Sequence, residues 1–245
     1  MQPDNFYEKL HADNTEYGLS RYDVPRLLGL PAFRRWLQRV DRSTKARLLE
    51  VGCGKGQFLL DLTELLRSCA QVSFARVAAV DLVKAPGNVL DRVSPKPELF
   101  QQSVDGVKLP FPDGSFDLVT CNHILEHLFQ TEHLLREIRR VLQKDGLAVI
   151  SVPNTAAWMN RIALLFAGQP LGSEVGTESI SYGFWPRFLA GRLDRFQPSG
   201  HIRDFTPRSL RDIAAHCGFK PAGWWAQNGG LIPTLTRNLG ILLEP

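Results

Sequence analysis

A glycine-rich turn near residue 50 is the strongest local indication of a ligand site. Residues 48–56 read Leu-Leu-Glu-Val-Gly-Cys-Gly-Lys-Gly, a hydrophobic run that ends in three closely spaced glycines. Glycines in such a turn allow a ligand to lie against backbone N–H groups at the start of a helix, where the helix dipole favours a negatively charged group. The sequence therefore predicts that a nucleotide-type cofactor approaches the backbone at Gly52, Gly54 and Gly56.

The spacing of the turn distinguishes between cofactor classes. A dinucleotide fingerprint reads G-x-G-x-x-G, whereas this turn reads G-x-G-x-G and carries Glu50 before its first glycine. A carboxylate would repel a pyrophosphate, but it suits a ligand that carries positive charge as well as a carboxylate, such as S-adenosylmethionine. Asp81 ends the next hydrophobic run, where its carboxylate can accept hydrogen bonds from a ribose. That contact fits NAD and S-adenosylmethionine equally.

The elements that must position these residues alternate between strands and helices from residue 45 to 154, which is typical of βαβ units around a parallel sheet. Hydrophobic runs predict strands at 47–51, 76–82, 116–121 and 147–152 and a helix at 57–67. A second helix should contain residues 134–142 and stop at Asp145-Gly146. A third should begin after the N-cap Thr206 and stop at Gly218.

Composition limits the class of protein. The 245 residues are 44% apolar and 22% charged, which is the ordinary composition of a globular protein. This composition excludes disordered, collagenous and coiled-coil chains. The net charge of +4 does not by itself indicate a class of binding partner. The four cysteines are widely separated without a CxxC pair, so we expect reduced thiols and no zinc knuckle. Because a signal-peptide pattern and an apolar run of roughly 18 residues are both absent, the expected location is the cytoplasm.

Three segments in order resemble the class I S-adenosylmethionine-dependent methyltransferases: residues 50–56, 80–82 and 105–119. Residues 122–128, Asn-His-Ile-Leu-Glu-His-Leu, and 134–146 are similar to the type 11 branch of that family, in which an E-H-L turn precedes a helix and a strand. The resemblance is close over 46–152 and loose over 201–226. It implies an α/β fold with a Rossmann-like, doubly wound, mostly parallel sheet.

The resemblance also implies how the chain is organised. We expect a single domain, with a helical N-terminal extension at 1–44, a cofactor-binding core at 45–154, a cap insertion at 155–203 and the C-terminal part of the fold at 204–245. The extension and the cap should cover one rim of the sheet and shape the acceptor pocket.

Residue roles follow from the same resemblance. The turn, including Cys53, would hold the methionine moiety of the cofactor and Glu50 would order it; Asp81 would bind the ribose. Leu82 would pack on the adenine, and Asp105 would accept a hydrogen bond from the adenine amino group. Gly106 replaces an alanine that is common in the family. The predicted cofactor-binding residues are Glu50, Gly52, Cys53, Gly54, Gly56, Asp81, Leu82, Asp105, Gly106 and Asn122.

Methyl transfer is an in-line displacement, so catalysis needs alignment of the two reactants and, for some acceptors, a base. We predict His123 or His201 as that base, because both should lie beside the cofactor edge and titrate near neutrality. His201 and Arg203 lie in a G-H-x-R-x-F-T stretch similar to relatives that act on glycans, lipids and small molecules. Glu126 and His127 fit a helix-start or packing pair better than a catalytic one. The reaction requires no metal, and none is predicted.

The acceptor is expected to be a small molecule, a glycan or a lipid-linked compound. A stripe of basic residues interleaved with aromatic ones is absent, which disfavours nucleic acid. A basic cluster, best explained as a solvated face, and an amphipathic segment at 158–166 are compatible with peripheral contact with an anionic lipid. The cluster comprises Arg34, Arg35, Arg39, Arg42, Lys45 and Arg47.

Two other functions remain open from the sequence. The chain could bind S-adenosylmethionine as a catalytically silent partner protein, because the cofactor residues would be the same. An NAD-dependent oxidoreductase fits less well, since it explains neither the glycine spacing nor Asp105 and the segment 110–117.

Overall fold

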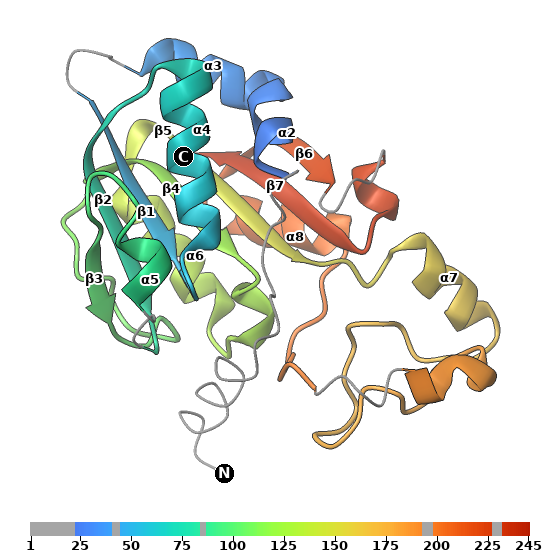
Figure 1. Ribbon diagram of the computed structural model, residues 1–245. Helices are drawn as coiled ribbons and strands as arrows, with labels where there is room; N and C mark the ends of the chain where they lie inside the picture. Colours follow the sequence, from blue (N-terminus) through green and yellow to red (C-terminus); the bar gives the residue numbers. More distant parts are fainter. Residues whose placement is uncertain (1–22, 41–44, 84–86, 193–197, 227–231) are drawn as a thin grey trace.

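The computed structural model describes residues 23–40, 45–83, 87–192, 198–226 and 232–245. Its centre is a seven-stranded sheet in the order β3-β2-β1-β4-β5-β7-β6 (Figure 1). Neighbouring strands from β3 to β5 run parallel, and β7 runs antiparallel to both β5 and β6. The predicted doubly wound, mostly parallel sheet is therefore confirmed. The strands are β1 (Ala46–Val51), β2 (Phe74–Asp81), β3 (Glu98–Gln101), β4 (Phe116–Asn122), β5 (Leu142–Pro153), β6 (Lys220–Ala226) and β7 (Asn238–Glu244).

The central strands are buried on both faces, which is why they appear in the sequence as continuous hydrophobic runs. In β1, Leu48 packs into one apolar cluster and Leu49 into the other, because successive side chains point to opposite faces. Helices α2 (Asp23–Gly29), α3 (Pro31–Arg39) and α4 (Gln57–Ala70) cover the Leu48 face. Helices α6 (Thr131–Val141) and α8 (Pro207–His216) cover the Leu49 face (Figure 1).

Shorter elements connect these layers. They are α5 (Gly87–Leu90), the 3-10 turns η1 (Leu125–His127), η2 (Arg187–Arg192) and η3 (Pro233–Leu235), and α7 (Trp158–Leu165). Helix α7 and the segment after it extend to one side of the sheet in Figure 1. Among the described residues, no helix is long and apolar enough to span a bilayer.

The predicted end of the helix before β5 is wrong. Helix α6 stops at Val141, because Leu142 adopts an extended backbone and already pairs with Phe116 of β4. Asp145 and Gly146 lie inside β5, in an irregular stretch of the ladder between the pairs Phe116–Leu142 and Leu118–Leu147. A turn-like dipeptide therefore forms an irregularity within a strand here, and not a helix stop.

The predicted helix after Thr206 is present. The Thr206 hydroxyl accepts a hydrogen bond of 3.2 Å from the Ser209 N–H, and the Ser209 hydroxyl accepts one of 2.9 Å from the Thr206 N–H. This reciprocal capping fixes the start of α8. The helix ends one residue before Cys217, and Gly218 follows with a φ of +88°.

Candidate functional site

The candidate site lies where the strand order reverses. Strands β1 and β4 are neighbours at the centre of the sheet. From β1 the chain continues outward through β2 and β3 on one side, and from β4 it continues through β5 on the other side. In open α/β sheets, ligands bind outside the carboxyl ends of the strands at such a point. The residues after β1 form the glycine turn, and β4 ends at Asn122, directly before His123.

The glycine turn has the left-handed backbone that its sequence predicts. Gly52, Gly54 and Gly56 have φ values of +75°, +49° and +83°. A Cβ atom at Gly52 would lie 2.0 Å from the Cδ1 atom of Ile124, so the turn and the segment after β4 approach closely. The Gly52 N–H donates a hydrogen bond of 2.7 Å to the Val80 carbonyl, which attaches the turn to β2.

Asp81 secures the same turn from the end of β2. Its Oδ2 accepts a hydrogen bond of 2.8 Å from the Gly54 N–H, and its Oδ1 accepts one of 3.1 Å from the Val83 N–H. Each carboxylate oxygen has a second acceptor position for a ligand hydroxyl. The neighbouring Leu82 lies partly exposed at the same sheet edge, with its carbonyl accepting a hydrogen bond from Gln101.

Two buried groups that can lose a proton lie at the turn, Glu50 before it and Cys53 within it. Glu50 is 2% exposed, and its Oε2 lacks a hydrogen-bond partner among the described residues. Burial, and then the charge of Asp81, raise the pKa of Glu50 well above its usual range. Burial likewise raises the pKa of the Cys53 thiol, so Cys53 stays protonated. A positively charged ligand beside Glu50 would supply the partner that its carboxyl group lacks.

Asp105 has a structural contact that the sequence did not indicate. Its two carboxylate oxygens accept hydrogen bonds of 3.0 and 2.7 Å from the N–H groups of Phe129 and Gln130, directly before α6. Gly106 follows with a φ of +70°, and its missing side chain leaves room for the Gln130 amide. Asp105 thus connects the loop after β3 to the start of α6.

Asn122 ends β4 beside β5, and His123 follows it directly. The Asn122 Oδ1 accepts a hydrogen bond of 2.9 Å from the Ser151 hydroxyl, and its buried Nδ2 lacks a hydrogen-bond partner among the described residues. His123 has a φ of +55°, which is uncommon outside glycine, and its N–H donates a hydrogen bond of 2.9 Å to the Ser151 carbonyl. Strained backbone of this kind concentrates at functional sites.

The His123 side chain pairs with a buried carboxylate. Its Nδ1 lies 3.1 Å from the Oε1 of Glu126, which is 1% exposed. Burial opposes ionisation of Glu126, but the hydrogen bond from His123 and the positive charge of the nearby histidines outweigh it and lower the pKa of this carboxyl. With its Nδ1–H held by Glu126, a neutral His123 ring has its basic lone pair on Nε2.

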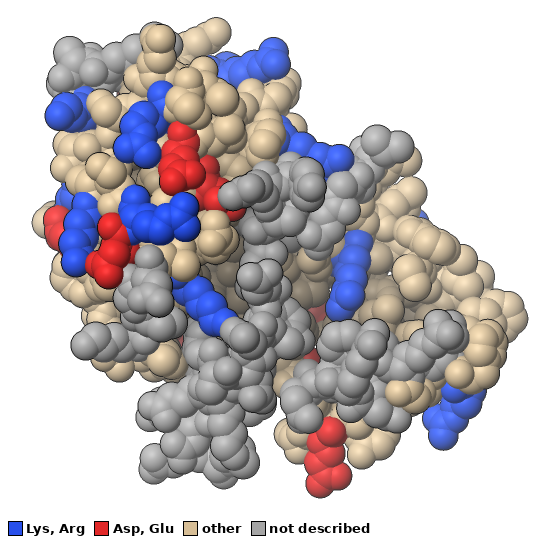
Figure 2. All heavy atoms as spheres, in the orientation of Figure 1, with Lys and Arg blue, Asp and Glu red and all other residues tan. Residues whose placement is uncertain are grey.

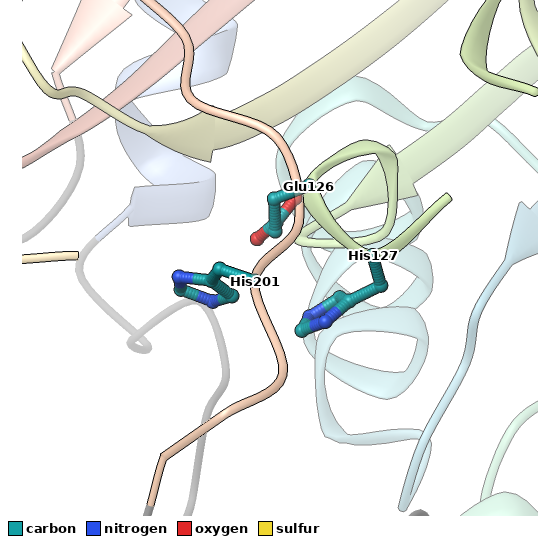
Figure 3. A group of neighbouring side chains, drawn as sticks. All are labelled: Glu126, His127 and His201. Carbon is teal, nitrogen blue, oxygen red and sulfur yellow. The ribbon is translucent and has the colours of Figure 1, made fainter. Parts of the chain in front are cut away.

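His201 is brought to the same place from a distant part of the chain. Its ring centroid lies 4.9 Å from that of His127, and Figure 3 shows both rings beside Glu126. The loop that carries His201 is held by Glu174, whose carboxylate accepts hydrogen bonds from the N–H groups of Ser199, Gly200 and His201 at 2.6, 2.8 and 3.2 Å. Glu174 was not predicted, because a single acidic residue in a loop carries no spacing signal.

The basic cluster and the amphipathic segment do not form one surface. Arg35 and Arg39 pair with Glu244 at 3.6 and 3.8 Å, and Arg47 pairs with Asp117 at 3.0 Å; Arg42 lies outside the described residues. Helix α3, which carries Arg34, Arg35 and Arg39, lies at the top in Figure 1, whereas α7 lies at the far right, and Figure 2 shows basic and acidic side chains intermixed on the visible face. The paired arginines agree with the solvated-face interpretation of the cluster.

Comparisons with known proteins give a consistent result. A family model described as a methyltransferase domain matches residues 24–222. The uncharacterized methyltransferase YcgJ of Bacillus subtilis is 31% identical over 100 residues, 41% of this chain and 38% of that protein. The ubiquinone/menaquinone biosynthesis C-methyltransferase UbiE of Azotobacter vinelandii is 28% identical over 192 residues, 76% of this chain and 70% of that protein. The chain thus matches between 38% and 70% of the length of these curated relatives.

A solved structure gives the same fold. The S-adenosylmethionine-dependent methyltransferase from Mesorhizobium loti superposes with a TM-score of 0.51 at 17% identity, covering 89% of this chain and 100% of that one. At this level of identity the likeness concerns the arrangement of the strands and helices.

Proposed function

The chain belongs to the methyltransferase-domain family of class I S-adenosylmethionine-dependent enzymes, and we propose that it transfers a methyl group from S-adenosylmethionine to a small-molecule, glycan or lipid-linked acceptor beside His123. The observation that carries the proposal is the attachment of the glycine turn to Asp81 at the switch point of the sheet. The family and its cofactor are established by the match over residues 24–222, and the acceptor is the proposed part.

The residues around the turn fit this cofactor. The buried Oε2 of Glu50 lacks a hydrogen-bond partner among the described residues, and a ligand with an ammonium group would complement it. In the proposed arrangement, the glycine turn lies against the methionine moiety and Asp81 binds the ribose hydroxyls through its remaining acceptor positions. Leu82 packs on the adenine, and Asp105 and Gly106 shape the loop at its edge. The bound cofactor supplies an activated methyl group on a sulfonium.

His123 is the proposed base. Glu126 holds its Nδ1–H at 3.1 Å, so the imidazole is oriented with Nε2 as the proton acceptor. Glu126 would also stabilise the imidazolium that forms when His123 takes a proton from an acceptor hydroxyl or an acidic carbon. His201 lies next to this pair and helps to line the acceptor side, together with Asn122 at the end of β4.

The segment 155–203, which we predict to be a cap insertion, favours an apolar acceptor or carrier among the proposed classes. Helix α7 and the residue after it expose large apolar side chains, with Leu165 81% and Phe166 58% exposed. Phe166 stacks on Trp185 at 4.2 Å, which links α7 to the segment that precedes η2. Exposed apolar side chains grouped on one element are typical of an interaction surface. Unchanged sedimentation of the chain with anionic and neutral liposomes would exclude the lipid-linked class.

Calorimetric titration with S-adenosylhomocysteine, beside NADH, tests cofactor binding first. We expect micromolar binding of S-adenosylhomocysteine, no binding of NADH, and at least a tenfold weaker affinity in Asp81→Ala. Asp145→Ala is the matched control, because Asp145 is exposed and lies in β5 away from the turn. Binding of NADH would overturn the cofactor assignment.

Turnover with S-adenosylmethionine and an acceptor panel tests the activity itself. Formation of S-adenosylhomocysteine that depends on the acceptor would support the enzyme. Tight cofactor binding without turnover on phenolic, sugar, carboxylate and lipid-linked acceptors would favour the silent partner protein.

A further inference from the structure

We propose that Glu126, His127 and His201 form a binding site for a divalent transition-metal ion, with zinc as the best match. Each of the three residues offers one ligand atom, and these atoms lie within 4.8 Å of one another. Ligand atoms on a tetrahedral zinc ion lie roughly 3.3 Å apart, given metal–ligand distances of about 2.0–2.2 Å. The ligand atoms are therefore at most about 1.5 Å further apart than on a tetrahedral ion. Figure 3 shows the three side chains next to one another.

The two histidines are held in the form that binds metal. His127 Nδ1 lies 3.3 Å from the Gly200 carbonyl, and His201 Nδ1 lies 2.9 Å from the Gly172 carbonyl. A carbonyl only accepts, so each ring in its neutral form presents its N–H at Nδ1 and carries its lone pair on Nε2. Metal-binding histidines characteristically donate their second ring N–H to a backbone carbonyl or a carboxylate.

Glu126 supplies an independent indication of a missing partner. The residue is 1% exposed, and its Oε1 is used by His123 at 3.1 Å. Its Oε2 is buried and lacks a hydrogen-bond partner among the described residues. A buried carboxylate oxygen without a partner is costly. A cation between Glu126 and the two imidazoles would complete its coordination.

The backbone fixes the ligands relative to one another although they are distant in sequence. The carbonyl of Glu126 accepts hydrogen bonds from the N–H groups of Ile202 and Arg203 at 2.9 and 3.0 Å. Glu174 holds the N–H of His201 from the other side. The guanidinium of Arg203 donates to the carbonyls of Leu128 and Phe129. The η1 turn and the His201 loop therefore form one connected unit.

The donor set selects the type of metal. Two imidazoles and one carboxylate suit zinc and other first-row transition ions, whereas magnesium and calcium prefer sites built of oxygen ligands. Three protein ligands leave a fourth position open, as in catalytic zinc sites. An acceptor oxygen is a suitable occupant of that position. Methyl transfer itself needs no metal, so this site goes beyond the proposed function.

Titration of the full chain with zinc chloride, after chelator treatment and removal of the chelator, tests the site. All proteins carry Cys69→Ser, because Cys69 is the exposed thiol. We expect one zinc ion per chain with micromolar or tighter affinity, and at least a tenfold loss in His127→Ala and in His201→Ala. His216→Ala, which removes an exposed imidazole on α8, should bind zinc as the parent does.

A second measurement keeps the test independent of folding and of methyl transfer. One equivalent of cobalt(II) should give the visible absorption of a four- or five-coordinate ion in the parent, and His201→Ala should lose it while keeping its S-adenosylhomocysteine affinity. Absence of zinc binding by the parent overturns the site, and so does unchanged affinity in both histidine variants. Failure of S-adenosylhomocysteine to bind, with zinc binding retained, would instead count against the proposed function alone.

Discussion

The carboxylate of Asp81 accepts a 2.8 Å hydrogen bond from the backbone N–H of Gly54, which joins the end of β2 directly to the turn after β1. Two strands that are neighbours in the sheet thereby share one ligand-binding loop. This bond makes the conformation of the turn depend on a residue 27 positions further along the chain. The shape of the turn and the position of the ribose-binding carboxylate are therefore coupled.

Gly52→Ala should reduce both stability and affinity for S-adenosylhomocysteine. The φ of +75° disfavours a side chain, and a Cβ atom would overlap the Ile124 side chain. We expect at least a tenfold weaker affinity by calorimetry and a lower urea midpoint. Gly29→Ala is the matched control, because among the described residues no atom beyond its chain neighbours and its own helix backbone lies within 4 Å of its Cβ position. Retained affinity in Gly52→Ala would show that the turn does not contact the cofactor.

Binding of S-adenosylmethionine should release a proton from Glu50. Burial and the charge of Asp81 raise the pKa of this carboxyl, which favours its protonated form in the free chain. A bound ammonium group would lower the pKa, so the affinity should increase with pH between the bound and the free values. Calorimetry in two buffers of different ionisation enthalpy measures the released proton.

Glu50→Gln provides the control for this proton. The variant cannot ionise, so it should bind S-adenosylmethionine more weakly and without proton release. Equal proton release in Glu50→Gln and the parent would assign the proton to another group.

Replacement of His123 should affect turnover far more than cofactor binding. Asparagine tolerates the left-handed backbone at this position better than most residues. His123→Asn should therefore fold and bind S-adenosylhomocysteine normally, while kcat falls by about 10²–10⁴ with an acceptor that must lose a proton. His216→Asn on α8 should leave kcat unchanged. A decrease of kcat by less than about tenfold in His123→Asn would exclude the base role.

Glu137 should contribute to stability through Arg140. The guanidinium donates to Oε1 and Oε2 of Glu137 at 2.8 and 2.7 Å, and Oε2 also accepts a hydrogen bond of 2.8 Å from the Leu109 N–H. Glu137→Gln should lower the free energy of unfolding by about 1–3 kcal/mol, measured in urea at neutral pH. Asp113→Asn, at a side chain that is 78% exposed, should cost less than about 1 kcal/mol.

The same pair predicts a pH dependence. The hydrogen bonds from Arg140 outweigh burial and lower the pKa of Glu137 below the ordinary glutamate value. Its contribution is present above the unfolded pKa and is lost as the pH falls through the lower folded value. The difference in stability between the parent and Glu137→Gln should therefore shrink within that window. A difference that stays constant across it would contradict the prediction.

The sequence predicts the core of the fold because its signals there are local. Strands β1, β2 and β4 are buried on both faces and appear as hydrophobic runs, and α8 begins with a recognisable cap. The predicted boundary between α6 and β5 is wrong. Pairing of Leu142 with Phe116 ends the helix earlier than the dipeptide Asp145-Gly146 suggests. Tertiary pairing overrode a local signal in that case.

The site was predictable only in part. The glycines, Asp81 and His123 stand in a motif, and the structure places them around one end of the sheet. Their contacts with a cofactor and an acceptor stay predictions. The approach of His201 to His127 is set by long-range hydrogen bonds of the η1 turn and Glu174, which no spacing in the sequence encodes. For the same reason, the sequence gives no indication of the metal site.

The position of β7 affects how the chain folds during its synthesis. Among the described strands it follows both of its neighbours in sequence, yet it pairs with β5 on one side and β6 on the other. Until residues 238–244 have left the ribosome, β5 has an open edge with free backbone hydrogen-bonding groups. Open edges can pair with other chains and promote aggregation. A nascent chain is thus exposed to misassembly at the edge of β5 until β7 is added.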